Sequence, residues 1–196
     1  MQIRIDSVSA EREDCTMHLD TKTGMLDQAY FHPSPNFDQR ESGAVPQAVI
    51  IHCISLPPGE YGGSEVLDFF ANKLNSHAHP YFLEICDLKV SAHFFIRRDG
   101  QLIQLVSTKQ RAWHAGESMC LGQSGVNNFS IGVELEGLDS DTDGYTDPQY
   151  FKLNELLDSL TESYPDIDAS NIFAHSDIAP GRKPDPGAYF NWSRIT

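Results

Sequence analysis

The sequence has few cysteines, and it lacks both a signal peptide and a long hydrophobic run. Its four cysteines lie far apart and never form a Cys-x-x-Cys pair, which favours reduced thiols. The first residues show no apolar run followed by a small-residue cleavage site. No stretch approaches the roughly 18 apolar residues that a membrane helix needs. We therefore expect a cytoplasmic protein; export by another route is the alternative.

Basic residues are also scarce. The 28 Asp and Glu residues against 14 Lys and Arg residues give a formal net charge of −14. An acidic surface repels nucleic-acid phosphates and anionic lipid headgroups, which argues against nucleic acid and membrane as partners. A length of 196 residues predicts one domain, over residues 1–196, and the chain contains neither repeats nor low-complexity tracts. A monomer is the expected state, although the sequence does not determine it. Residues 1–29 form an N-terminal arm, in which Ile3, Ile5 and Val8 are an alternating apolar pattern.

Hydrophobic patterns predict both strands and helices. Apolar runs predict strands at residues 48–54, 90–96, 102–106, 131–136 and 172–174, with a hairpin turn at residues 98–100. One helix is predicted from residue 65 to about residue 74, capped by Ser64. Asp147 is the expected cap of a second helix, which has Pro148 at its first position and ends near Ser163.

A proline-stiffened stretch at residues 175–187 combines an imidazole, a lysine and a carboxylate. Two Pro-Gly dipeptides in it are typical of tight turns. The apolar run at residues 172–174 is expected to be a buried strand that brings His175 to a sheet edge. His175 and Asp185 would then be two metal ligands, with Lys183 facing the same cavity. A proline-rich loop with a capping histidine and solvated charges is the alternative, and this stretch alone leaves both open.

Two further polar residues interrupt apolar strands. His52 lies in the run at residues 48–54, where a buried imidazole needs a partner or a metal. Glu134 shares one strand face with Gly132 and Glu136. Two neutral imidazoles and one carboxylate suit Zn²⁺ and leave a fourth position open, as in catalytic zinc sites. In such a site Glu134 could move protons and Lys183 could stabilise an oxyanion.

Other candidate metal residues are interpreted differently. His32 lies beside a proline in a loop, and His77 and His79 lie in a polar corner, so surface or structural roles are expected for all three. Residues 139–144 resemble the start of an EF-hand calcium loop. The twelfth position of that loop is Tyr150 instead of the required Glu, and the preceding element is a predicted strand, so calcium is rejected.

Five motifs lie in order along the chain, at residues 52–63 (HCISLPPGEYGG), 91–100 (SAHFFIRRDG), 111–116 (RAWHAG), 129–137 (FSIGVELEG) and 175–187 (HSDIAPGRKPDPG). Over about residues 30–192 the chain closely resembles the AmpD-type 1,6-anhydro-N-acetylmuramoyl-L-alanine amidases. The resemblance implies an α/β (α+β) fold like that of peptidoglycan recognition proteins, with a mixed central sheet flanked by helices.

The resemblance also implies a site and a reaction. It implies zinc on His52, His175 and Asp185, with Glu134 as the catalytic acid and base and Lys183 as the stabiliser of the transition state. The reaction would be hydrolysis of the amide between the muramoyl lactyl group and L-alanine in recycled cell-wall fragments. A small muropeptide is therefore the expected partner.

The sequence departs from the family at two candidate substrate-binding positions. Cys53 stands where asparagine is usual and Lys89 where arginine is expected. Lysine cannot bind a carboxylate bidentately as arginine does, so recognition of an acidic stem peptide is expected to be weaker or altered. Tyr81, Trp113 and His114 are further candidates for substrate contact, with plain packing as the alternative for the two aromatic residues.

Two other functions fit parts of this pattern. A protein of the same fold can bind muropeptides for sensing without zinc or catalysis, but it would not need the metal ligands together with the Glu/Lys pair. A wall-cleaving autolysin would share the chemistry, but it would have to be exported. The enzyme acting on soluble fragments is the favoured hypothesis.

Overall fold

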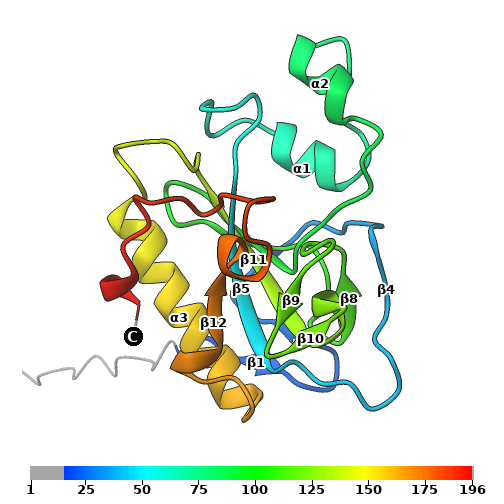
Figure 1. Ribbon diagram of the computed structural model, residues 1–196, viewed down its shortest axis with the longest axis vertical. Helices are drawn as coiled ribbons and strands as arrows, with labels where there is room; N and C mark the ends of the chain where they lie inside the picture. The colour runs from blue at the N-terminus through cyan, green and yellow to red at the C-terminus, as the bar shows by residue number, and fades with distance from the viewer. Residues whose placement is uncertain (1–15, 196) are drawn as a thin grey trace, which may run out of the picture.

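A six-stranded mixed sheet forms the centre of the computed structural model, which describes residues 16–195 (Figure 1). Its strand order is β12-β5-β11-β6-β7-β3. The strands are β12 (Ile172–Ala174), β5 (Ala48–Ile54), β11 (Ser130–Glu136), β6 (Phe94–Ile96), β7 (Leu102–Gln104) and β3 (Tyr30–Phe31). The first four are parallel to one another, β7 is antiparallel to β6, and β3 is parallel to β7. The predicted mixed central sheet is confirmed.

Short elements surround this sheet. Three two-stranded sheets pair β1 (Leu19–Asp20) with β2 (Met25–Leu26), β4 (Phe37–Gln39) with β8 (Gln110–Ala112), and β9 (Met119–Cys120) with β10 (Gln123–Ser124). The α-helices are α1 (Glu65–Phe70), α2 (Pro80–Ile85), α3 (Asp147–Ser163) and α4 (His175–Ile178). Single 3-10 turns are η1 (Val126–Asn128), η2 (Ala169–Asn171) and η3 (Trp192–Arg194). Within residues 16–195, none of the helices has both the length and the apolar character that crossing a membrane requires.

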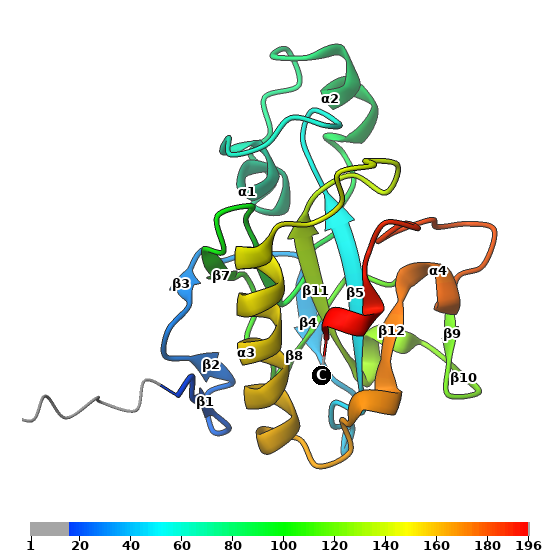
Figure 2. The same cartoon turned by 90° about the vertical axis from the view of Figure 1, so that its left-hand side faces the viewer.

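Helix α3 covers one face of the sheet (Figure 2). Successive side chains of a strand point to opposite faces, so alternate residues of β5 and β11 share this face. Their buried apolar side chains pack against the apolar stripe of α3, and the cluster comprises Val49, Ile51, Ile131, Val133, Leu135, Leu153, Leu156, Leu157 and Leu160, among others. From the N-terminal arm, Leu19 and Leu26 are buried in the same cluster. The expected pattern of Ile3, Ile5 and Val8 lies outside the described residues.

The opposite faces of the same strands pack against other segments. Ala48 and Ile50 of β5 contact a smaller cluster with Ala115, Val126 and Phe129. A third cluster joins α1, α2, β6 and β7 through Phe69, Phe70, Phe82, Phe95 and Ile103. Figures 1 and 2 place α1 and α2 at the end of the molecule toward which the β5 and β11 arrows point. The carboxyl ends of these strands are therefore flanked by α1 and α2.

Several predicted boundaries are corrected. The helix predicted to reach residue 74 ends at Phe70, because Asn72 takes a left-handed φ of 58°. The strand predicted from residue 90 begins at Phe94, because Ser91 donates its N–H to the carbonyl of Trp113 outside the ladder. The predicted hairpin at residues 98–100 joins β6 to β7 as expected.

Helix starts account for two other differences. The sequence interpretation missed α2, where the ring of His79 accepts the Tyr81 N–H and Pro80 occupies the first turn. For α3 the cap is Thr146, one residue before the predicted Asp147. Thr146 accepts the N–H of Gln149, whose side chain accepts the Thr146 N–H in return. This reciprocal pair is a capping box, which satisfies two backbone groups at once.

We predict that Leu156→Ala will destabilise the fold, because Leu156 is fully buried between α3 and the sheet. Loss of a buried Leu side chain leaves a cavity and costs about 2–5 kcal/mol in the free energy of unfolding. Phe151→Ala on the same helix is the matched control, because Phe151 is 64% exposed and should change stability by about 0.5 kcal/mol or less. Urea denaturation of both variants measures the difference. Equal losses would contradict the assigned core.

Candidate metal and catalytic site

The site is built where parallel strands end together. His52 of β5 stands directly beside Glu134 of β11 in the ladder. Strand β12 runs parallel to β5 and ends at Ala174, so that His175 follows at the same edge and opens α4. The chain then turns through residues 179–185, and the carbonyl of Asp185 accepts the Ser176 N–H, which closes the loop. Ligand sites commonly form at this carboxyl edge of parallel strands.

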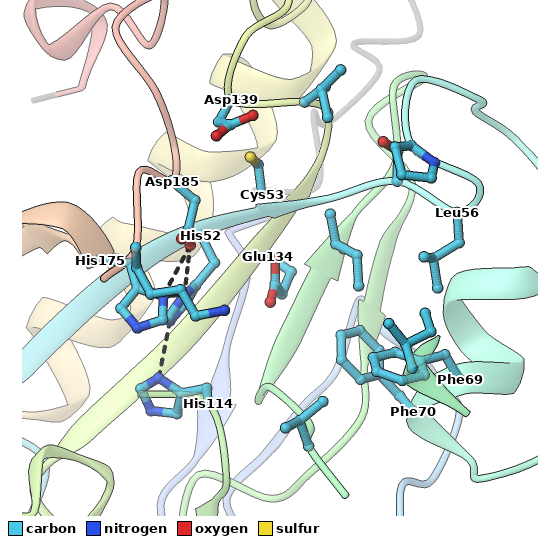
Figure 3. A pocket seen from close by; sticks show the side chains of 18 of the residues that line it. His52, Cys53, Leu56, Phe69, Phe70, His114, Glu134, Asp139, His175 and Asp185 are labelled. Carbon is cyan, nitrogen blue, oxygen red and sulfur yellow. Dashed lines mark hydrogen bonds and ion pairs between the residues drawn. The ribbon is translucent and has the colours of Figure 1, made fainter. Parts of the chain in front are cut away.

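Three side chains converge on one point (Figure 3). His52 Nδ1 and His175 Nδ1 lie 2.9 Å apart. Asp185 Oδ2 lies 3.1 Å from His52 Nδ1 and 3.0 Å from His175 Nδ1. Among the described residues, these three form the group whose donor atoms are close enough to hold one metal ion. The predicted ligand set is thus brought together from segments 123 residues apart.

The donor set fits a bound cation. The other ring nitrogen of His175, Nε2, lies 3.1 Å from the carbonyl oxygen of Ala115, which can only accept. Arg182 Nη2 also lies 3.4 Å from this nitrogen, but it donates to the Ala115 carbonyl at the shorter distance of 2.7 Å. In its neutral form His175 therefore carries its ring proton on Nε2, and its Nδ1 lone pair faces the Asp185 carboxylate. Two buried acceptors at this distance repel each other unless a positive ion lies between them. Burial also lowers the pKa of His52 to about 4, which leaves the neutral imidazole that a metal needs.

Glu134 is the one buried carboxylate beside this cluster with an unpartnered oxygen among the residues described. The residue is 9% exposed, and its Oε2 atom is buried without a hydrogen-bond partner. Burial raises the pKa of Glu134 well above its ordinary value, and the charge of Asp185 adds to this, whereas Lys183 opposes it. A carboxyl group with a raised pKa is suited to accept and return a proton.

A cavity of about 350 Å³ contains these groups. Lys183 lines it from an otherwise exposed loop position. The opposite wall is apolar, and it is formed by Leu56, Pro58, Phe69, Phe70, Tyr81, Ile85, Leu88 and Val90. Figure 3 shows Leu56, Phe69 and Phe70 on this wall, across from His52, His175 and Asp185. The cavity therefore joins a charged end to an apolar end.

The candidate substrate residues divide into two groups. Cys53, Tyr81 and His114 line the cavity. Lys89 is exposed and lies outside the cavity lining, as does Trp113, whose side chain is hydrogen-bonded to Asp38. Substrate contact by any of the five stays a prediction.

Sequence reasoning missed several residues that hold the site in place. The hydroxyl of buried Tyr145 donates to the carbonyl of Pro186, next to Asp185. Arg182 donates to the carbonyl of Ala115, 2.7 Å away, and so joins the ligand loop to residues 112–116. The motif at residues 111–116 was the available signal, but it does not reveal which way His114 and Ala115 face.

Comparison with known proteins decides the family. The sequence pattern described as N-acetylmuramoyl-L-alanine amidase matches residues 42–188, which include all the residues of the converging cluster. The chain belongs to the N-acetylmuramoyl-L-alanine amidase family. The predicted family and the predicted class of enzyme are confirmed.

Relatives of this amidase agree with that placement. The 1,6-anhydro-N-acetylmuramyl-L-alanine amidase AmpD of Escherichia coli K12 is 49% identical over 163 residues, which cover 83% of this chain and 87% of the relative. A crystal structure of an AmpD derivative superposes with a TM-score of 0.87 at 46% identity, covering 92% of this chain and all of that one. E. coli AmiD, in complex with the substrate anhydro-N-acetylmuramic acid-L-Ala-D-gamma-Glu-L-Lys, matches with a TM-score of 0.57 at 25% identity, covering 80% and 59% of the two chains.

We predict that a divalent cation will stabilise this amidase after it has been stripped with a chelator. At a hundredfold excess over Kd, a ligand that binds only the folded state adds about 2.7 kcal/mol to the free energy of unfolding. Zn²⁺ should therefore raise the Tm of the wild type, whereas His175→Ala should abolish the shift. The control is His77→Ala, which removes an exposed histidine outside the cluster. An undiminished shift in His175→Ala would contradict the ligand assignment.

Proposed function

We propose that this amidase uses Zn²⁺ to hydrolyse the amide between 1,6-anhydro-N-acetylmuramic acid and L-alanine in soluble muropeptides. The cytoplasm is its proposed location and the recycling of cell-wall fragments its proposed role. Support comes from the relative named for this substrate and from the AmiD complex with an anhydromuramyl peptide. A monomeric state and the absence of nucleic-acid partners are parts of the same proposal.

One observation carries the proposal. The three converging acceptor atoms and the unpartnered Glu134 carboxylate share a single cavity. Zn²⁺ held by two imidazoles and a carboxylate supplies Lewis acidity, which polarises a carbonyl and lowers the pKa of water to roughly 7. A protein that only binds muropeptides has no use for this arrangement.

Glu134 would move the protons of the reaction. As a carboxylate it accepts a proton from the water that attacks the amide carbonyl. As the resulting acid it gives that proton to the L-alanine nitrogen as the C–N bond breaks, so the product is a peptide with a free amine. One group can do both because Glu134 lines the cavity and burial raises its pKa.

Lys183 would stabilise the negative charge that develops on the carbonyl oxygen. Lys183 belongs to the same loop as Asp185 and lines the same cavity. Because this charge exists only in the transition state, the contribution of Lys183 should appear in kcat and not in substrate affinity.

The remaining cavity surface suits an amphipathic substrate. The apolar wall with Tyr81 can pack against the less polar side of a sugar ring or a peptide side chain. Cys53 and His114 also border the space. Lys89 and Trp113 are outside the cavity lining, so they would contact only a substrate that extends beyond it, and Lys89 would meet an acidic peptide with a single point charge.

We predict that Glu134→Gln will retain zinc and substrate affinity but lose most of kcat. General acid–base groups typically contribute about 10²–10⁴-fold, and the amide cannot accept the proton. Lys183→Ala should lower kcat by about 10²–10³ with KM nearly unchanged. The assay is the release of a peptide with a free L-alanine amine from anhydromuramyl peptide.

The matched control is Glu136→Gln, two residues further along β11. Glu136 is also buried, but its oxygens accept the backbone N–H groups of Gly62 and Arg98. Its replacement should lower stability and leave kcat within a few-fold of the wild type. Near wild-type kcat in both Glu134→Gln and Lys183→Ala would favour a muropeptide sensor over an amidase, as would a wild type that binds without cleaving.

We also predict that soluble muropeptides will be cleaved well and that purified sacculi will release little product. Residues of α1, of α2 and of the loop at residues 183–185 line the cavity from several directions, which favours a small fragment over an intact wall. Mass spectrometry of the products from a defined panel measures both rates. Comparable rates on the two substrates would support an autolysin.

A further inference from the structure

A hydrogen-bonded chain leads into the site from behind His52. It begins at Ser130 in β11, whose hydroxyl donates to the carbonyl oxygen of Val126, 2.7 Å away. A carbonyl oxygen only accepts, so the hydroxyl proton is committed to Val126. The Ser130 oxygen can then only accept from its other neighbour, Nε2 of His114 at 3.1 Å.

The direction of this bond determines the tautomers of two histidines. His114 carries its proton on Nε2, so its Nδ1 is an acceptor. That Nδ1 lies 3.0 Å from Nε2 of His52, which must therefore carry the His52 proton. The lone pair of His52 is left on Nδ1, the atom that faces His175 and Asp185. Of the two neutral tautomers of His52, only this one can bind a cation there.

The neighbouring residue does the same for the second histidine. The carbonyl of Ala115 accepts the Nε2 proton of His175, 3.1 Å away. The consecutive residues His114 and Ala115 thus contact the outer nitrogens of both imidazole ligands. Asn127 holds this pair in place, because its Oδ1 accepts the backbone N–H of His114 at 3.1 Å and of Ala115 at 2.8 Å.

The sheet also leaves space for the His114 ring. A Cβ on Gly132 would lie 2.5 Å from Cγ of His114, so a larger residue in this part of β11 would push the ring away. Gly132 lies between Ser130 and Glu134 on the same strand face, next to β5. The His114 and His52 rings meet edge to face, with centroids 5.1 Å apart. The absence of a side chain at Gly132 in β11 therefore allows the His114 ring to contact His52.

We propose that His114, backed by Ser130, is a positioning residue that fixes His52 in its metal-binding tautomer. This rests on the metal site of the proposed function. Both ring nitrogens of His114 form hydrogen bonds within the protein. His114 therefore acts by orienting His52, and its ring has no nitrogen left to bond a substrate.

The test compares three variants by titrating Zn²⁺ into the metal-free protein against a chromophoric chelator. His114→Phe keeps a ring in this space but removes both hydrogen bonds, and should weaken the Kd for Zn²⁺ by about 10–100-fold. His114→Gln should restore binding to within a few-fold, because the amide oxygen can accept from His52 while the NH₂ donates to Ser130. Ser130→Ala should weaken binding in the same direction, although Ser130 does not touch a ligand.

The matched control is His93→Phe. His93 is fully buried near His114, but its Nδ1 accepts the Gly132 N–H and its Nε2 faces the Gln110 carbonyl, without a hydrogen bond to His52. Its ring also contacts the His114 ring edge to face, with centroids 5.7 Å apart, so its loss should lower the Tm and weaken the Kd for Zn²⁺ much less than His114→Phe does. If His93→Phe and His114→Phe weaken binding equally, the effect is general destabilisation and the proposal is wrong.

A direct readout is the ¹⁵N NMR spectrum of the imidazoles in the metal-free wild type, which requires neither zinc nor turnover. We expect protonated Nε2 and bare Nδ1 in both His52 and His114. A proton on Nδ1 of His114 would overturn the proposal. Because NMR and metal binding are measured without substrate, failure of the amidase assay alone would count against the proposed function and not against this role of His114.

Discussion

The rest of the structure depends on three acceptor atoms within about 3 Å of one another, two on buried histidines and one on the partly buried Asp185. His52 Nδ1, His175 Nδ1 and Asp185 Oδ2 lie 2.9 to 3.1 Å apart, at a distance where lone pairs repel unless a cation satisfies them. Such a cluster stays together only if each group is held from outside. Strand pairing positions His52, the closed loop positions Asp185, and hydrogen bonds to the outer ring nitrogens orient both imidazoles. The arrangement is therefore costly without a cation and suited to hold one.

The two faces of the sheet have different roles: one packs in the hydrophobic core and the other carries residues of the site. One face of β5 and β11 is apolar and packs against α3 in a cluster of buried side chains, whose removal from water stabilises the fold. The other face carries Ser130, Gly132 and Glu134 in line, opposite Ala48, Ile50 and His52 of the neighbouring strand. Because the strands are parallel and in register, polar groups on that face lie side by side without any help from loops. A rigid strand pair is a better support for reacting groups than a loop, since its geometry is fixed by many backbone hydrogen bonds.

The sequence predicts the sheet and the converging residues well, and the reasons are local. A polar residue such as His52 or Glu134 inside an apolar strand is conspicuous, and the motifs that contain them resemble a known family. Boundaries were less predictable. The end of α1 depends on a left-handed Asn72, and the start of α2 depends on capping by the ring of His79, a residue that rarely indicates a helix start. The role of His114 could not be predicted, because it follows from hydrogen bonds to partners that only the folded chain brings together.

The spacing of the ligands gives the metal a topological role. His175 and Asp185 are 10 residues apart, whereas His52 is 123 residues from His175. A cation that joins all three closes a loop over most of the chain, and a cross-link of that span removes entropy from the unfolded ensemble, about 4.7 kcal/mol for a 100-residue loop in the case of a disulfide. The ion would then be a reversible cross-link between β5 and the loop that carries Asp185. Loss of the ion would end catalysis and would also shorten the lifetime of the native state. Molecules without metal would therefore be both inactive and the most readily degraded by cellular proteases.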